Sequence, residues 1–218
     1  LPLFGGIMAD LFPGISRPNI DYGALLTSIK CSTEANGLQP HEFFIRKNIQ
    51  LYETIVVRHG LMVVGPTGGG KSANLKCLSD ALTGLKKAGI KGQNYEKVHH
   101  YKMNAKAITM DQLYGCFDPN TREFIDGQLP MLYRRATEDS TPDRKFIIFD
   151  GPVDAIWIEN MNTVLDDNKK LCLFSGEMIA MSDEMSMIFE TEDLDVASPA
   201  TVSRVGVVYM EPLSLGLT

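Results

Sequence analysis

The sequence predicts an α/β fold in which a doubly wound parallel sheet is sandwiched between helices. Short continuous apolar runs recur along the chain, the form that a strand takes when both faces of a parallel sheet are covered. Helical patterns with apolar residues three and four positions apart lie between these runs. Strands that alternate with helices in this way indicate a doubly wound sheet. The expected strands are residues 61–64, 146–149, 185–189 and 205–209, with a weaker candidate at 98–103.

Several helical patterns accompany the strands, after an N-terminal loop rich in glycine and proline. Pro40 opens the second of these helices. Thr109 and Gln112, three residues apart, form a capping box that predicts a further short helix. The longer helices are expected around residues 24–29, 43–55, 75–85 and 157–165.

Two β-hairpins are expected as insertions that break the alternation. Turn residues at Asp118-Pro119-Asn120 and Asp126-Gly127 mark a hairpin over residues 117–127, with another helix after it. A second hairpin turns at Ser175-Gly176. Inserted hairpins either contact partners or decorate the surface, and the sequence favours neither interpretation.

Length and composition indicate one globular domain. The chain has 218 residues, of which 44% are hydrophobic and 22% charged, as in proteins that bury a core. We divide this single domain, residues 1–218, into an N-terminal loop with helices, residues 1–60, and an α/β core, residues 61–218. Both ends of the chain are expected to have been cut from a longer protein.

Charge, hydropathy and cysteine spacing argue against several classes of protein. The net charge is −6, so any phosphate chemistry must be local and non-specific binding of nucleic acid is not expected. No apolar run approaches the roughly 18–20 residues of a bilayer span, so no membrane partner is expected. The cysteines lack the spacing of zinc ligands and are expected to be reduced core thiols of an intracellular protein. They are Cys31, Cys77, Cys116 and Cys172.

The segment from Gly65 to Ser72 carries the strongest chemical signal. It matches the pattern G-x-x-x-x-G-K-[ST] directly after an expected strand and directly before an expected helix. In such a loop, backbone N–H groups converge on phosphates, Lys71 pairs with the β and γ oxygens, and the Ser72 hydroxyl ligates Mg²⁺. We predict an ATP or ADP site with Mg²⁺ formed by Gly65, Pro66, Thr67, Gly68, Gly69, Gly70, Lys71 and Ser72.

The end of the strand at residues 146–149 completes this site but omits a catalytic base. Asp150 is expected to hold Mg²⁺ through water, as the acidic residue after the second strand of a P-loop protein does. Where such a site hydrolyses its nucleotide, a glutamate usually follows, but here Gly151 follows. Asp154 and Glu159 lie too far along the chain and are expected to be surface carboxylates. We therefore assign no catalytic residue and predict binding without appreciable hydrolysis.

Longer stretches of the sequence resemble one known family. Residues 149–170, which begin Phe-Asp-Gly-Pro-Val-Asp-Ala-Ile-Trp, and residues 197–204, Ala-Ser-Pro-Ala-Thr-Val-Ser-Arg, resemble the second AAA+ module of dynein heavy chains. The resemblance extends through residues 11–14, Arg58-His59-Gly60 and the P-loop, and so covers essentially the whole chain. The sequence of residues 152–157 is more similar to that of axonemal, inner-arm heavy chains than to that of the cytoplasmic heavy chain.

This resemblance implies the P-loop NTPase fold of the AAA+ class, as the large subdomain of a module whose C-terminal helical lid is absent from the chain. It implies a nucleotide-binding, largely non-hydrolysing module with a structural and regulatory role in a six-module motor ring. The implied partners are the neighbouring AAA+ modules of the same heavy chain, the linker domain and, indirectly, the microtubule. The implied location is the cytoplasm, the cytoskeleton and the axoneme of cilia and flagella.

The resemblance also implies contacts to the nucleotide. In this family the loop ahead of the first helix covers the base, so Leu11, Phe12 and Pro13 are expected to contact adenine. The residue that follows the strand at 185–189 is expected to approach the γ-phosphate as a sensor. The candidates are Glu190 and Glu192.

Arg204 is the candidate for a role at a neighbouring module. Ser198 is expected to cap a short helix that Pro199 begins, which places Arg204 at the rim of the sheet just before a strand. In ring ATPases this rim faces the nucleotide of the preceding module, so Arg204 is expected to act there as an arginine finger. The alternative is an arginine that pairs with a helix end or a carboxylate.

Three other functions stay open at this point. An autonomous ATPase of the AAA+ class would need a substitute base and a self-assembled ring. A small-molecule kinase would need an arginine-rich lid, and only Arg134-Arg135 forms an arginine pair. A plain scaffold would keep the P-loop empty.

Overall fold

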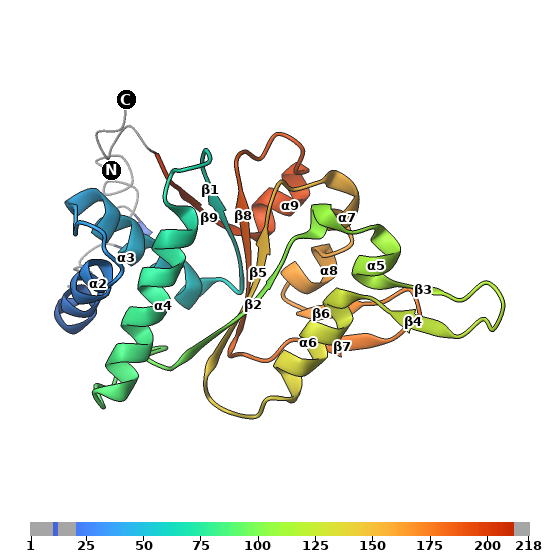
Figure 1. Cartoon of the computed structure of the whole chain (residues 1–218), viewed down its shortest axis with the longest axis horizontal. Coiled ribbons are helices and arrows are strands. Elements are labelled where there is room, and N and C mark those ends of the chain that lie inside the picture. The colour runs from blue at the N-terminus through green and yellow to red at the C-terminus, as the bar shows by residue number, and fades with distance from the viewer. Residues whose placement is uncertain (1–10, 13–20, 212–218) are drawn as a thin grey trace.

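A five-stranded parallel sheet forms the centre of the molecule. The computed structural model describes residues 11–12 and 21–211. The strand order is β2-β5-β8-β1-β9, and each pair of neighbours runs parallel, so the expected α/β fold with a doubly wound sheet is confirmed (Figure 1). The strands are β1 (Gly60–Val64), β2 (Val98–Met103), β5 (Arg144–Asp150), β8 (Met185–Thr191) and β9 (Gly206–Tyr209).

Helices cover both faces of this sheet. Figure 1 shows α2, α3 and α4 on one side and α5 to α9 on the other. The first group is α2 (Gly23–Ala35), α3 (Glu42–Val57) and α4 (Lys71–Lys87). The second group is α5 (Met110–Tyr114), α6 (Gln128–Glu138), α7 (Ala155–Glu159), α8 (Asn162–Leu165) and α9 (Pro199–Arg204), with a 3₁₀ turn at Ala105–Ala107 before it.

The sheet divides the core into two apolar layers. Leu61 and Val63 of β1 pack with α2, α3 and α4, whereas Met62 and Val64 face the opposite layer. This division follows from the alternation of side chains along a strand, and it explains why the central strands read as continuous apolar runs. In the opposite layer the ring of Phe149 stacks on that of Phe189, with 4.8 Å between the centroids.

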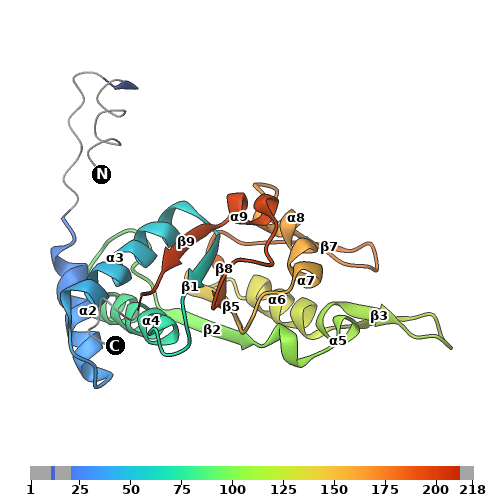
Figure 2. The ribbon, with the colours of Figure 1, turned by 90° about the horizontal axis from the view of Figure 1, so that it is seen from above.

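Both expected hairpins are present and lie far from α2 and α3 (Figure 2). The first pairs β3 (Gly115–Phe117) with β4 (Phe124–Asp126), and the second pairs β6 (Lys170–Cys172) with β7 (Met178–Ala180). Arg134 of α6 links them, because its guanidinium contacts Asp126 and Glu177 at 2.6 Å each. The hairpins are therefore tied to each other through α6.

Two expected elements differ from the prediction. The helix expected over 157–165 is divided into α7 and α8 by a tighter turn, in which the N–H of Met161 donates to the carbonyl of Ile158 at 3.0 Å, and Asn162 at the start of α8 accepts from Thr201 of α9 at 3.1 Å. The strand expected at 205–209 is an edge strand, and only Val208 within β9 is fully buried. Its residues Val207 and Tyr209, on one face of the strand, are about half exposed, and among the described residues β9 has a neighbouring strand, β1, on one side only.

The expectation that all four cysteines lie in the core is wrong, although all four are free thiols. Cys77 of α4 is buried, Cys116 is half-buried, and Cys31 and Cys172 are exposed. Cys172 lies on the outer face of a two-stranded hairpin, of which only one face is covered. Within the described residues, no helix is long and apolar enough to cross a membrane.

Candidate functional site

The P-loop lies at the carboxyl edge of the sheet, between the end of β1 and the start of α4 (Figure 1). β5 ends nearby with Asp150, and Glu190 is the next-to-last residue of β8. Open parallel sheets bind their ligands at this edge, because the loops that leave the strands meet there. The fold thus brings together the loop and the acidic residue that the sequence predicts as one site.

The backbone of the loop depends on glycine at its first position. Gly65 has a φ of +155°, and a Cβ there would lie 2.2 Å from the carbonyl oxygen of Met210. Met210 is itself fixed beside β1, because its N–H donates to the carbonyl of Val64 at 2.7 Å. The 17-residue helix α4 begins directly after the loop, so its first N–H groups point toward the loop, where an anion would be stabilised.

Lys71, the first residue of α4, bends back over the loop. Its Nζ donates to the carbonyl oxygens of Gly65 at 2.5 Å and Pro66 at 3.0 Å. These carbonyls are neutral acceptors, and a phosphate oxygen is a stronger acceptor for an ammonium group. The lysine is therefore held close to the position that a phosphate would take.

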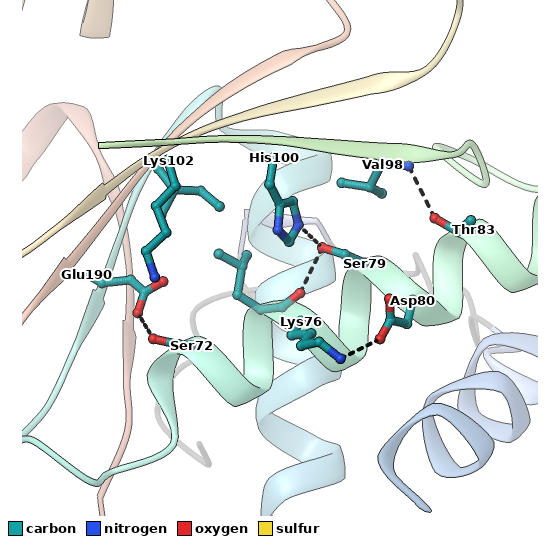
Figure 3. Close-up of a pocket in the computed structure, with 11 residues that line it drawn as sticks. Ser72, Lys76, Ser79, Asp80, Thr83, Val98, His100, Lys102 and Glu190 are labelled. Atoms are coloured by element: carbon teal, nitrogen blue, oxygen red, sulfur yellow. Dashed lines mark hydrogen bonds and ion pairs between the residues drawn. The ribbon is translucent and has the colours of Figure 1, made fainter. Parts of the chain in front are cut away.

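Oxygen donors suited to Mg²⁺ gather beside Lys71. The hydroxyl of Ser72 donates to the carboxylate of Glu190, and Asp150 lies opposite Glu190 in the register of β5 and β8. Lys102 of β2 forms an ion pair with Asp150, with 2.9 Å between Nζ and Oδ2. Figure 3 shows Lys102, Glu190 and Ser72 converging at one end of a cavity.

Burial and neighbouring groups shift the pKa values of Glu190 and Lys102. Glu190 is only 3% exposed, and burial raises the pKa of its carboxyl group, against the opposing effects of the Ser72 hydrogen bond and of Lys102. The hydrogen bond to Asp150 raises the pKa of Lys102. The cluster therefore contains one ion pair, between Lys102 and Asp150, beside Glu190 and the lysine of the P-loop.

These residues fit a nucleotide-bound magnesium ion. Mg²⁺ prefers oxygen ligands and is usually held by one or two carboxylates together with substrate phosphates. Ser72, Asp150 and Glu190 supply a hydroxyl and two carboxylates beside the N-terminus of α4. In the ranges 11–12 and 21–211, no group of three or more His, Cys, Asp or Glu side chains is placed to hold a metal ion.

Gly151 follows Asp150 in a backbone conformation that side chains of L-residues rarely adopt. Gly151 has a φ of +142°, and a Cβ there would lie 3.0 Å from Oδ1 of Asn104. Asp154 is exposed and caps α7, where it accepts from the N–H of Ile156 at 2.8 Å. Glu159 is exposed at the end of α7. The prediction that Asp154 and Glu159 are surface carboxylates is confirmed.

A cavity of about 310 Å³ extends from this cluster between α4 and β2 (Figure 3). His100 of β2 lies in its wall and contacts the hydroxyl of Ser79 at 2.7 Å. Because Ser79 donates its own proton to the carbonyl of Leu75 at 2.8 Å, His100 is the donor and its Nε2 carries a hydrogen. Burial lowers the pKa of His100, so the ring is held neutral.

Four further residues are predicted to contact the nucleotide, and the structure describes three of them. Glu192 lies over the P-loop, where its carboxylate accepts from the hydroxyl of Thr67. Leu11 and Phe12 are exposed, at 66% and 48%, and Pro13 lies outside the described residues. The contacts of these three residues with adenine, and that of Glu192 with a phosphate, stay predictions.

Arg204 is the last residue of α9, where the sequence places it. The hydroxyl of Ser198 accepts from the N–H of Thr201 at 3.3 Å, so the predicted cap of this helix is confirmed. The guanidinium of Arg204 donates to Asp166 and, at 2.8 Å, to the carbonyl of Ala200. This is the local ion pair that the alternative interpretation of Arg204 expects, and the role as an arginine finger stays a prediction.

Sequence reasoning missed two contacts of the site. It considered Glu190 only as a sensor of the γ-phosphate and did not place it on Ser72, and it gave Lys102 no role. A signal for Glu190 is present, because a carboxylate that follows the apolar strand residues 185–189 must find a partner. Lys102 gave a weaker signal, since β2 is an edge strand with mixed polarity.

Comparison with known proteins agrees with this geometry. Residues 60–205 match the family model described as AAA domain (dynein-related subfamily), and residues 1–72 match the one described as hydrolytic ATP binding site of dynein motor region. The chain is 57% identical over all 218 residues to dynein axonemal heavy chain 1 of Rattus norvegicus and 56% to that of Homo sapiens. It is 55% identical over 217 residues, or 99% of its length, to human dynein axonemal heavy chain 3. It spans about 5% of the length of each of these relatives.

The neutral state of His100 predicts a dependence of stability on pH. A buried histidine whose pKa is lowered in the fold binds fewer protons than in the unfolded chain, so the free energy of unfolding falls as the pH drops below about 6.5. His100→Gln keeps a donor for Ser79 and removes the titration, so its stability should fall less between about pH 7.5 and about pH 5.5. Urea unfolding at both values measures this. Ser79→Ala is the control, because it removes the hydrogen bond and keeps the titrating ring; equal pH slopes for wild type and His100→Gln would contradict the prediction.

Proposed function

The chain belongs to the dynein-related subfamily of AAA domains, and from this premise we propose that it is a nucleotide-binding module of an axonemal dynein heavy chain. More finely, we propose the second module of the motor ring, in a heavy chain of the inner-arm type. Its place would be the axoneme of a cilium or flagellum. Its partners would be the neighbouring modules, the linker domain and, through the ring, the microtubule.

The observation that carries this proposal is the convergence of the loop, Lys71, Ser72 and Asp150 at one edge of the sheet. The family model covers all of these residues. In binding, the loop N–H groups and Lys71 would hold the phosphates of ATP or ADP, and Lys71 would leave the carbonyls of Gly65 and Pro66 to do so. Mg²⁺, when bound, would neutralise phosphate charge; Ser72 would ligate it and Asp150 would orient its water.

We propose further that this module binds nucleotide without appreciable hydrolysis and serves a structural and regulatory role. The support is Gly151, which stands where a hydrolysing site carries a glutamate and whose φ of +142° is one that side chains of L-residues rarely adopt. A long-lived nucleotide at this site would stabilise the module within the ring by its binding energy alone.

The first prediction from this proposal concerns Lys71. Its replacement in Lys71→Ala removes a charge-assisted contact to phosphate, worth about 1.5–3 kcal/mol, so affinity for Mg·ADP should fall about ten- to a hundredfold or more. Isothermal calorimetry on the 218-residue chain measures the dissociation constant. Lys87→Ala, in the last turn of the same helix, is the matched control and should bind as the wild type does. Equal affinity of Lys71→Ala and wild type would refute the site.

The second prediction concerns turnover. The wild-type chain should release phosphate far more slowly than the about 1–10³ per second typical of enzymes, while ATP still raises its melting temperature. Gly151→Glu should not install full hydrolysis, because residue 151 has a φ of +142° and a Cβ would crowd Asn104. A phosphate-release assay on both proteins checks this. Several turnovers per minute by the wild-type chain would support an autonomous ATPase instead.

The third prediction concerns Arg204 in the complete heavy chain. As an arginine finger it would contribute about 10³–10⁵ in rate at the neighbouring module, so Arg204→Ala should depress ATP turnover of the motor. Nucleotide affinity at Lys71 should be unchanged.

Asp166→Ala separates this role from a structural one. It removes the ion pair and keeps the guanidinium, so a finger predicts near-normal turnover in this variant. If Arg204→Ala and Asp166→Ala lower the melting temperature alike and both keep turnover, Arg204 is a structural residue and the finger is excluded.

A further inference from the structure

The contacts of Glu190 and Lys102 lead beyond the P-loop and the predicted magnesium residues. We propose that Glu190 is a second carboxylate of the magnesium site, and that Lys102, through its ion pair with Asp150, competes with the metal ion for that carboxylate. This inference rests on the proposed nucleotide-binding function. Glu190 would position the metal ion, and Lys102 would compete with the metal ion for Asp150.

Glu190 is placed for this role by the sheet. β5 and β8 run parallel in a register that pairs Asp150 with Glu190, so both side chains leave the same face of adjacent strands, which lie about 4.8 Å apart. Ile148 and Ile188, two positions earlier on the same strands, pack in the apolar layer that includes α4, so this face is turned toward α4 and Ser72. The register therefore places both carboxylates on the face where Ser72 contacts Glu190.

The burial of Glu190 needs an explanation that its bond to Ser72 does not supply. A carboxylate only 3% exposed loses most of its hydration, and a serine hydroxyl returns one neutral hydrogen bond. A carboxylate has room for about four hydrogen bonds. A hydrated Mg²⁺ ion beside Ser72 would offer bound water molecules as strongly polarised donors to the remaining lone pairs.

Lys102 brings a positive charge to Asp150 from the neighbouring strand β2. It lies on β2 opposite Ile148 and therefore on the same face as Asp150, two residues further along β5. Its Nζ is 2.9 Å from Asp150 Oδ2, and its charge also acts on Glu190. The side chain of Lys102 is 50% exposed and lies at the end of the cavity in Figure 3, so it has space to swing away from Asp150.

The two roles make opposite predictions for Mg²⁺. Binding of the metal must break the pair between Lys102 and Asp150 and move Ser72 from Glu190 to the metal. A variant without the Lys102 charge should therefore bind Mg²⁺ more tightly. A variant without the Glu190 charge should bind it more weakly, because changes to groups that orient metal ligands typically cost about 10–100-fold in affinity.

The experiment measures the concentration of Mg²⁺ at which nucleotide binding is half-maximal. The 218-residue chain is stripped of nucleotide with EDTA, and the fluorescence of N-methylanthraniloyl-ADP is followed as Mg²⁺ is added. We expect the midpoint to rise at least about tenfold in Glu190→Gln and to fall several-fold in Lys102→Met. Lys102→Arg keeps the charge and should stay close to the wild type. Binding of Mn²⁺ in the presence of ADP, followed by electron paramagnetic resonance, gives a second readout.

Matched controls are available elsewhere in the fold. Glu138→Gln at the end of α6 and Lys170→Met on β6 carry the same changes at exposed positions and should keep the wild-type midpoint. Because Lys102 is half exposed, Lys102→Met remains informative even if Glu190→Gln does not fold. If nucleotide still binds and the midpoint is unchanged in either Glu190→Gln or Lys102→Met, this inference is overturned and the proposed function is not affected. A wild-type chain that binds no nucleotide at any Mg²⁺ concentration overturns the proposed function as well.

Discussion

The parallel register of β5 against β8 is the constraint on which the site depends. It places Asp150 opposite Glu190, on the face turned toward α4. A slip of one residue would turn either carboxylate to the other face, where the rings of Phe149 and Phe189 stack. Because both faces of these strands are covered by apolar layers, such a slip would also expose those rings to polar neighbours. The packing of the core therefore fixes the position of the acidic residues, and the site requires no separate scaffold.

The same register makes the edge of the sheet a nearly neutral cluster. Lys71 and Lys102 balance Asp150 and Glu190, and each of the four groups has a hydrogen-bond partner in the protein. A ligand must break these contacts before it makes its own, so its affinity is a difference between two sets of charge-assisted bonds. Any ligand of Lys71, Ser72 or Asp150 therefore replaces a contact that the protein itself already makes.

The sequence predicted the framework well because the framework follows local rules. Apolar runs, helical spacing, turn residues and the capping box depend on neighbours along the chain, and these predictions are confirmed. The errors arose where distant contacts decide. The helix at 157–165 is divided where α8 packs against α9 through the bond between Asn162 and Thr201, and β9 lies at the edge of the sheet, a place that its apolar run does not report. The contact of Ser72 with Glu190 likewise joins segments 118 residues apart, and no periodicity reports it.

Gly151, at the position where a hydrolysing site carries a glutamate, is bonded to the strand that carries Glu190. Its N–H donates to the carbonyl of Glu190 at 3.2 Å, so it extends the pairing of β5 and β8 by one step beyond Asp150. It does so with a φ of +142°, which side chains of L-residues rarely accept, and its Cα faces Asn104. A glutamate at residue 151 would have to turn the chain away from this conformation and weaken that bond. A glutamate at residue 151 would therefore be strained in the conformation that pairs β5 with β8, so we expect its introduction to disturb the pairing that places Glu190 opposite Asp150.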